Sequence, residues 1–189
     1  MRPMSLWESK ESKGTVSLKD LFDGGASFPW DLNQDFQLED AAHLTCRGGW
    51  PIAVLAPKDI ACRALNIMPE DLMRDLESFG LFFEDLAVRD LRVYAGTLGG
   101  MVRHYRDNAG LECDAVVHLE DGRWGAIEIK LGGDELIEAG ATSLKTLKSK
   151  IEEKSDENSP SFLLVLTAVG GAYKREDGVY VAPVNLLKP

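Results

Sequence analysis

The segment from Glu112 to Lys130, ECDAVVHLEDGRWGAIEIK, restricts the fold of this chain more than any other stretch. The dipeptide Asp121-Gly122 separates two runs of alternating apolar residues, which predicts a β-hairpin. A two-residue loop would pair Asp114 with Ile129 and put the acid among isoleucines. A three-residue loop, with Gly122 in the left-handed position of a bulge, pairs Asp114 with Glu128. Because a slip of one residue turns a whole strand over, the apolar pattern favours the three-residue loop.

This register divides the hairpin into two faces. One face is apolar and gathers Ala115, Val117, Leu119, Ile127 and Ile129. The other carries the charged residues and gathers Asp114, Val116, His118, Trp124, Ala126, Glu128 and Lys130. The register also places Lys130 opposite Glu112. We therefore expect the two carboxylates of Asp114 and Glu128 to lie side by side on one face.

Two neighbouring carboxylates repel each other unless something compensates their charge. A Mg²⁺ ion is one compensator, because it prefers oxygen ligands and keeps several waters. Lys130 is another, since it can neutralise the pair or orient a water. We therefore predict Asp114 and Glu128 as metal ligands and, with Lys130, as catalytic residues for phosphodiester hydrolysis. The alternative interpretation is a solvated strand face with cross-strand ion pairs, each of which contributes little.

A helical region is expected before the hairpin. Met68-Pro69-Glu70-Asp71 has proline and acids where a helix begins. An apolar stripe at helical spacing follows, and Gly80 interrupts it: Leu72, Leu76, Phe79, Phe83 and Leu86. Glu84 lies at the edge of this stripe, where it could reach toward the sheet. It is either an accessory acid of the site or an ordinary surface glutamate.

The remaining pattern completes an α/β order of strand, strand, strand, helix, strand. Strands are expected at 101–106 and 161–169, a helix follows Asp134, and residues 173–182 form a terminal hairpin. The helix buries Ile137, Gly140, Leu144, Leu147 and Ile151. Gly140 costs roughly 1 kcal/mol against alanine within a helix, so we expect it to mark close packing on the sheet. The prediction is a small mixed sheet flanked by helices.

Residues 1–57 are interrupted by stretches rich in polar residues and glycine. We expect loops with short helices around Leu18–Phe22 and Leu38–Leu44, attached loosely to the rest as an irregular N-terminal appendage.

Two stretches, FGLFFEDLAVRDLRVYA (79–95) and GGMVRHYRDNAGLECDAVVHLEDGRWGAIEIKLGG (99–133), resemble a known domain. It is the C-terminal domain that follows an AAA-type ATPase domain in a large group of prokaryotic proteins. That domain resembles the PD-(D/E)XK nuclease fold, which implies a restriction-endonuclease-like core. On this pattern Asp114 matches the first acid, Glu128 and Lys130 match the second acid and the lysine, and Glu84 matches an accessory acid. Cys113 replaces the proline that names the motif.

The N-terminus resembles other parts of the same family. Residues 2–22 are similar to the end of the ATPase domain, and residues 48–57 to the start of the region after it. At about Lys58 the chain passes to a later family segment, residues 59–76. No GxxxxGK[ST] motif occurs, so no nucleotide site is expected. We interpret the chain as a shortened member: a remnant-like segment at 1–57 and a nuclease-like α/β domain at 58–189.

Charge limits the functions that fit. The formal net charge is -10, and phosphate contacts dominate affinity for nucleic acid, so the chain is expected to bind nucleic acid only with help from a partner. Basic residues flank the hairpin and either attract phosphate or form ordinary polar edges: Arg103, His104, Arg106, Lys145, Lys148, Lys150 and Lys154. The competing function is a non-catalytic interaction module that binds a protein partner or a second copy of the chain.

The location expected for the chain is the cytoplasm. Cys46, Cys62 and Cys113 have no metal-type spacing and suggest reduced thiols. The N-terminus lacks the apolar core of a signal peptide, and the longest apolar run, 162–169, is too short to cross a membrane. No membrane contact is expected.

Overall fold

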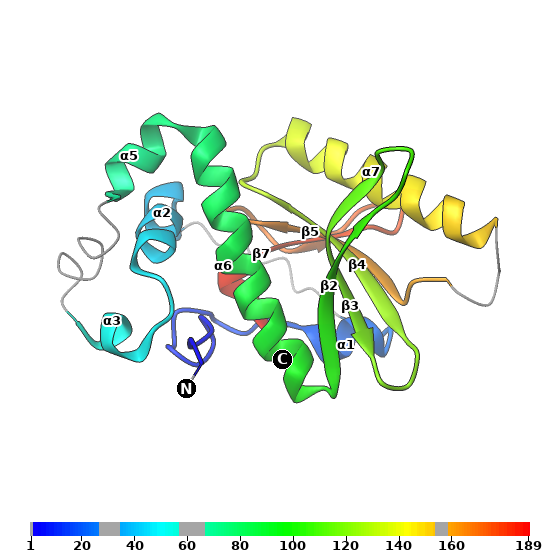
Figure 1. Ribbon diagram of the computed structural model, residues 1–189, viewed down its shortest axis with the longest axis horizontal. Coiled ribbons are helices and arrows are strands. Elements are labelled where there is room, and N and C mark those ends of the chain that lie inside the picture. The colour runs from blue at the N-terminus through cyan, green and yellow to red at the C-terminus, as the bar shows by residue number, and fades with distance from the viewer. Residues whose placement is uncertain (1, 27–34, 57–66, 154–158) are drawn as a thin grey trace.

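The computed structural model describes residues 2–26, 35–56, 67–153 and 159–189, and these form a mixed α/β fold (Figure 1). Its main sheet has six strands in the order β2-β3-β4-β5-β7-β6. The strands are β2 (Gly100–Arg106), β3 (Glu112–Leu119), β4 (Trp124–Lys130), β5 (Phe162–Thr167), β6 (Tyr173–Lys174) and β7 (Tyr180–Pro183). The first three pair antiparallel, β4, β5 and β7 pair parallel, and β6 closes the far edge antiparallel. The expected small mixed sheet is confirmed.

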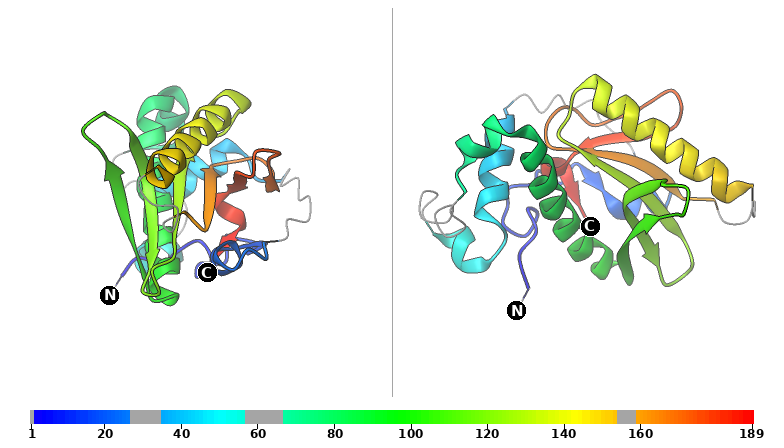
Figure 2. Two further views of the ribbon diagram at one scale, coloured as in Figure 1. Left: turned by 90° about the vertical axis from the view of Figure 1, so that its right-hand side faces the viewer. Right: turned by 45° about the horizontal axis from the view of Figure 1, so that its top comes forward.

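Two long helices cover opposite faces of this sheet, as the right-hand view of Figure 2 shows. Helix α6 (Leu76–Thr97) packs on the face that carries Ala115, Val117, Ile127 and Ile129. Helix α7 (Asp134–Glu152) makes the crossover from β4 to β5 and packs on the face of Val116, Trp124 and Ala126. Each strand alternates its side chains between the two cores, which is why β4 and β5 are buried almost throughout.

Gly140 confirms the expected close contact between α7 and the sheet. A Cβ atom at this position would lie 3.3 Å from a methyl group of Val165 and 3.4 Å from the Cβ of Glu128. The glycine therefore lets the helix axis approach β4 and β5 at the place where Glu128 leaves the sheet.

The hairpin has the predicted register. Ala115 pairs with Ile127 and His118 with Trp124, which is the register of the three-residue loop. The Leu119 N–H donates to the Arg123 carbonyl at 2.8 Å, and Gly122 has a φ of 91°, as its left-handed bulge position requires.

The N-terminal segment contains α1 (Leu18–Phe22), α2 (Leu38–Arg47), α3 (Pro51–Leu55) and α5 (Pro69–Arg74). Strand β1 (Val16–Ser17) pairs parallel with β8 (Leu187–Lys188), which follows a 3-10 turn, η2 (Val184–Leu186). The short helices at the two predicted places are confirmed. The expectation of a loose attachment is wrong, because Leu6, Leu18, Leu21 and Phe22 are buried in the same core as α6 and the sheet.

The predicted interruption of the helical region at Gly80 is also wrong. The break lies at Asp75, which ends α5 and caps α6 by accepting a hydrogen bond from the Ser78 N–H at 3.1 Å. An aspartate side chain that caps a new helix competes locally with continuation of the old one. A glycine only lowers the helix propensity at its position, so the helix can continue through it. Leu76, expected in the buried stripe, is half exposed at this first turn, whereas Phe79 and Phe83 are fully buried.

Some expectations fall on residues outside the described ranges: Cys62, Lys154 and most of the loop at 155–160. Among the described residues, no helix combines the length and the apolar character needed to cross a membrane.

Candidate active site at the end of the β3–β4 hairpin

Asp114 lies in a β-bulge of β3. On the β2 side Arg103 pairs with Val116 and Tyr105 with Cys113, so two residues of β3, Asp114 and Ala115, oppose the single residue between them on β2. Such an irregularity re-aims a side chain and is common beside active sites. The ladder between β3 and β4 ends at Ala115, and beyond it the Ile129 N–H donates to Asp114 Oδ2 at 2.7 Å. The aspartate thus replaces a backbone acceptor where the strands diverge.

Lys130 joins the two acids. Its Nζ donates to Glu128 Oε2 at 2.7 Å and to Asp114 Oδ2 at 3.1 Å. Glu128 is buried, with 5% of its surface exposed, and its Oε1 accepts a hydrogen bond from Ser143 of α7 at 3.0 Å. We call Asp114, Glu128, Lys130 and Ser143 the hairpin cluster. Sequence reasoning missed Ser143, and no signal in its neighbourhood marks it.

Lys130 does not form the expected pair with Glu112. Glu112 instead forms a salt bridge with Arg106 of β2, with 3.1 Å between Arg106 Nη1 and Glu112 Oε1. The divergence of β3 from β4 explains the difference, because it moves Glu112 toward β2 while Lys130 turns back to the acids.

Burial and charge shift the proton affinities in the cluster. Burial raises the pKa of the Glu128 carboxyl, and the neighbouring charge of Asp114 raises it further, although Lys130 and Ser143 oppose the shift. For Lys130, burial works against the charged form. The hydrogen bond that Lys130 donates to Glu128 and the charges of both acids outweigh burial and hold the lysine pKa above its ordinary value. The lysine is therefore protonated at neutral pH.

Glu84 comes from α6, on the other side of the bulge. It is half-buried, and its pKa is raised by burial first and then by the charge of Asp114, with Lys130 opposing. The helix therefore carries the glutamate close enough for the charges to act on each other. Within the described ranges, no hydrogen bond joins Glu84 to the cluster.

The carboxylate oxygens of Asp114 and Glu128 are the type of ligand that Mg²⁺ prefers, but the part of the protein that the structure describes does not supply a complete set of ligands. Among the described residues, no group of three or more His, Cys, Asp or Glu side chains is arranged to hold a metal. Mg²⁺ commonly uses only one or two carboxylates and completes its shell with waters and substrate phosphates. Asp114 Oδ1 accepts no hydrogen bond from the described residues. The fully buried Thr167 hydroxyl, paired beside Lys130 on β5, also lacks a partner within them.

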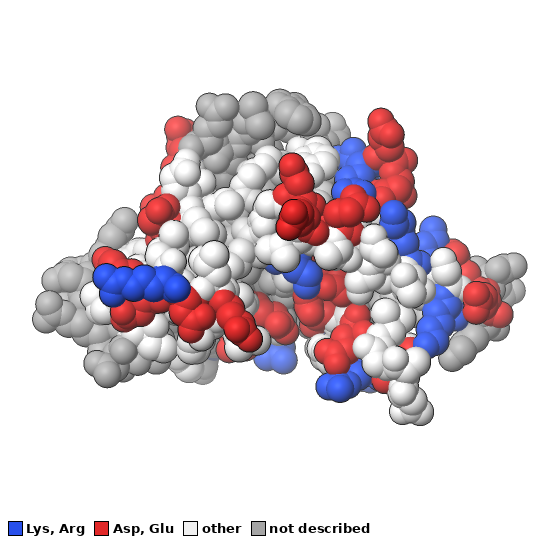
Figure 3. Space-filling model, turned by 90° about the horizontal axis from the view of Figure 1, so that it is seen from above, with Lys and Arg blue, Asp and Glu red and all other residues white. Residues whose placement is uncertain are grey.

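Most basic side chains near the hairpin are held by acids. Lys145 contacts Asp177, Lys148 contacts Glu152 and Lys150 contacts Asp107. On the face shown in Figure 3, basic side chains lie among acidic ones and do not form one continuous patch. The interpretation of these residues as polar edges of a strand and a helix therefore describes them better than a phosphate-attracting rim.

Cys113 and His118 do not join the cluster. Burial raises the pKa of the Cys113 thiol to about 12, and its sulfur lies 3.4 Å from the Ile127 carbonyl, so it is a packed thiol and not a nucleophile. His118 shares the α7 face with Glu128, but its ring stacks on Trp124 with centroids 6.3 Å apart.

Comparison with known proteins gives one match. A family model described as a domain of unknown function, DUF4143, matches residues 79–187, more than half of the chain. This domain is found in AAA-ATPase-associated proteins, which agrees with the ATPase association that the sequence resemblance implies. The searches of curated proteins and of solved structures found no match. The match begins in α6 and ends in β8, so it contains Glu84 and the whole hairpin cluster. The chain belongs to the DUF4143 family.

Proposed function

We propose that the hairpin cluster is a metal-dependent site for phosphodiester hydrolysis on a restriction-endonuclease-like core. The observation that carries the proposal is the convergence of Asp114 and Glu128 on one lysine at a bulged, partly open end of the hairpin. Asp114 and Lys130 keep 20% and 24% of their side-chain surfaces exposed, so solvent and a substrate phosphate can reach them. A salt bridge needed only for the fold has no requirement for this access.

Asp114 and Glu128 would hold Mg²⁺, which would polarise the phosphate and lower the pKa of an attacking water. Lys130 donates hydrogen bonds in this mechanism. Because it is protonated at neutral pH, it orients the water or a phosphate oxygen and neutralises charge that develops there. Glu84 assists as a proton acceptor at the edge of the site, since its raised pKa makes it a stronger base than an ordinary glutamate.

The substrate in this proposal is nucleic acid, which the chain binds weakly alone and more tightly with help from a partner. The net charge of -10 opposes unaided binding, and the acids that pair with the lysines of α7 remove much of the local attraction for phosphate. An associated ATPase-containing protein would supply the missing affinity. The interpretation of the chain as a shortened relative of such proteins belongs to this proposal.

The test is cleavage of labelled DNA with Mg²⁺ or Mn²⁺. We expect Asp114→Ala and Lys130→Ala to lower the rate at least 100-fold, which corresponds to about 2.7 kcal/mol of transition-state stabilisation. Glu112→Gln is the matched control: this acid lies two residues from Asp114 on the same strand but pairs with Arg106, so its variant should cleave at the wild-type rate. Equal background rates in all four proteins would end the proposal.

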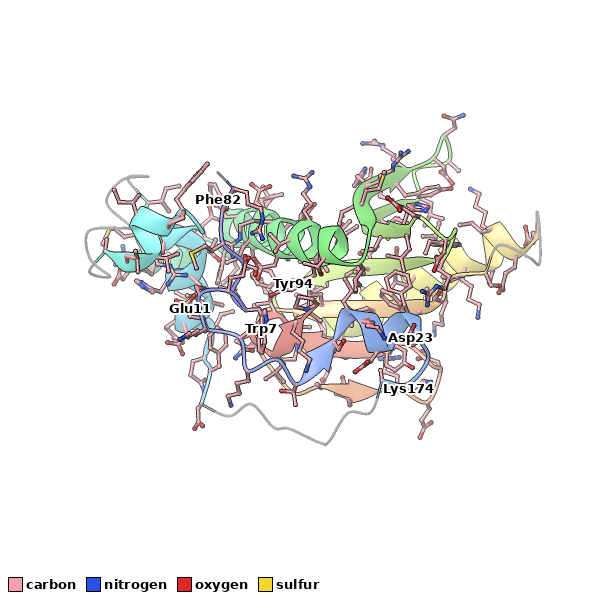
Figure 4. All side chains as sticks on the ribbon, turned by 90° about the horizontal axis from the view of Figure 1, so that it is seen from below. Trp7, Glu11, Asp23, Phe82, Tyr94 and Lys174 are labelled. Carbon is pink, nitrogen blue, oxygen red and sulfur yellow. The ribbon has the colours of Figure 1, made fainter. Side chains whose placement is uncertain are left out.

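A non-catalytic interaction module is the second candidate. It is favoured by apolar side chains exposed on the first half of α6, where Leu76, Leu81 and Phe82 keep 52%, 66% and 41% of their surfaces exposed. Phe82 lies on the side of α6 away from the sheet (Figure 4). This candidate predicts that Leu81→Glu disrupts a complex with a protein partner or a second copy, measured by sedimentation, while substitutions in the hairpin cluster leave the complex intact.

A further inference from the structure

A second concave site lies on the α7 face of the sheet, away from the hairpin cluster. It is a pocket of about 320 Å³, within the range of ligand sites, and we call it the stacking pocket. Its lining includes Arg103 and Tyr105 of β2, His118 and Trp124 of the hairpin, and Leu147 and Ile151 of α7. None of the residues that line it is acidic, although the chain as a whole carries a net charge of -10.

Strand pairing explains why these side chains gather. Arg103 lies opposite Val116, and Tyr105 lies opposite Cys113; residues that face each other across a ladder share one face. The bulge brings both Val116 and Cys113 into the α7 core although they are three positions apart, so Arg103 and Tyr105 lie over the same face. Outside the lining residues, the salt bridge between Lys150 and Asp107 ties the β2–β3 turn to α7.

The chemistry of the pocket suits a flat aromatic ligand with a negative charge beside it. His118 is exposed and stacks on Trp124 with 22° between the ring planes, so its outer face is presented to solvent. Burial first, and then the charge of Arg103, lower the pKa of His118, which keeps the ring neutral at physiological pH. Aromatic faces of this kind stack on nucleobases regardless of sequence, and an arginine adds a phosphate contact.

The stacking pocket lies in line with the hairpin cluster. Ser143 of the cluster and Leu147 and Ile151 of the pocket are spaced four residues apart on one face of α7. Along β3, Asp114 and His118 are four residues apart, which a rise of about 3.3 Å per residue makes roughly 10–13 Å once the bulge is allowed for. At about 3.4 Å per stacked nucleotide, three or four nucleotides span that distance.

We propose that the stacking pocket binds a nucleobase of a single-stranded nucleic acid whose backbone runs along α7 to the hairpin cluster. The course of the strand toward the hairpin cluster rests on the proposed function. Binding of the base in the stacking pocket can be measured separately from cleavage. A base inside a duplex is stacked on its neighbours and has no free face to offer His118, so duplex DNA is excluded from this mode.

The experiment is fluorescence anisotropy at low salt and in EDTA. The probe is a fluorescein-labelled oligodeoxythymidylate about 12 nucleotides long, within the usual site sizes for single-strand binding. We expect Arg103→Gln and His118→Ala to weaken binding roughly tenfold, as loss of one stacked base or its phosphate contact does. Arg106→Gln is the matched control, since it removes the same charge from the same strand but from a residue paired with Glu112.

The outcomes separate the two proposals. Lys130→Ala should keep oligonucleotide binding while losing cleavage, and the same strand annealed to its complement should bind at least tenfold more weakly. Equal affinities of Arg103→Gln and Arg106→Gln, equal binding of the duplex, or no binding by the wild type would overturn the stacking pocket. Intact binding without cleavage in any protein would instead overturn the hydrolysis proposal alone.

Discussion

Two clusters of charged side chains, one on α6 and one at the end of the β3–β4 hairpin, differ in how completely their acids are paired. Asp90, fully buried, accepts hydrogen bonds from the Leu6 N–H at 2.9 Å and from Arg89 at 2.6 Å, and its Oδ2 lies 3.3 Å from the Tyr94 hydroxyl. We call these residues the N-terminal cluster. Both Asp90 oxygens are occupied. In the hairpin cluster, by contrast, Asp114 keeps one oxygen free of hydrogen bonds from the described residues, and both Asp114 and Lys130 reach solvent.

The difference shows that a buried charge can serve either folding or ligand binding, depending on how completely it is paired. The N-terminal cluster fixes the segment of Leu6 to α6, and Figure 4 shows Trp7 and Tyr94 next to each other at this place. A closed set of partners stabilises a contact but leaves no position for a ligand. The hairpin cluster is partly satisfied by Lys130 and partly open, which suits a site that exchanges waters and phosphate.

The largest expected effect is on stability and comes from the N-terminal cluster. Asp90→Ala removes the acceptor of Leu6 and leaves the Arg89 guanidinium without its buried partner. We expect the free energy of unfolding to fall by about 3–5 kcal/mol. Asp114→Ala should cost about 1 kcal/mol, because that carboxylate is partly solvated. Urea unfolding measures both, and an equal or reversed order would show that the two clusters do not differ in the way described.

Lys130→Met should destabilise the protein by roughly 2–3 kcal/mol at pH 8, because it leaves Glu128 buried without its cation. The figure is below the full cost of breaking a completely buried pair, since Lys130 is partly exposed. The loss should be smaller at pH 5. The folded pKa of Glu128 is already raised, and it rises further without Lys130. The penalty is therefore absent below the unfolded pKa near 4.5 and grows as the pH increases toward the folded value.

Lys19→Met is the control for that measurement. Lys19 forms an exposed pair with Asp23, with 63% of the lysine side chain accessible, so its removal should leave stability unchanged at both pH values. A pH-independent loss in Lys130→Met would mean that Glu128 does not carry the titration.

A smaller effect is expected at Ser143. Replacing it with alanine removes the hydrogen bond to Glu128 Oε1 and should cost about 1 kcal/mol. The Glu128 pKa should rise further, because the hydroxyl favours the ionised form; carbon-detected NMR titration would show the change. Thr146→Ala, one turn along α7, removes a hydroxyl that donates to the helix carbonyl of Thr142 and should leave this pKa unchanged.

The sequence predicted the hairpin cluster in part because turn chemistry and apolar alternation act locally. Asp121-Gly122 and the pattern on both strands determine the register without help from the rest of the chain. The bulge at Asp114 depends on how β2 pairs with β3, and that pairing cannot be read from one strand. The pattern of the hairpin alone therefore predicts Lys130 opposite Glu112, whereas in the structure its side chain turns toward Asp114 and Glu128.

The N-terminal cluster was missed for a related reason. Asp90 lies in a helix where a charged residue is ordinarily exposed, and its partner at Leu6 is a backbone group 84 positions away. Only the tertiary fold brings a backbone donor to a helix face. The same long-range packing explains why the segment before α6 is part of the core although its polar, glycine-rich sequence predicts loops.

The most direct test of the difference between the clusters is stabilisation by Mn²⁺, measured as the shift in unfolding free energy with metal concentration. A ligand at 100 times its dissociation constant stabilises the native state by about 2.7 kcal/mol. We predict that Mn²⁺ stabilises the wild-type protein and Glu112→Gln, and that Asp114→Asn loses this gain while remaining folded. No stabilisation of the wild type, or an equal gain in Asp114→Asn, would contradict the assignment of the hairpin cluster as a metal site.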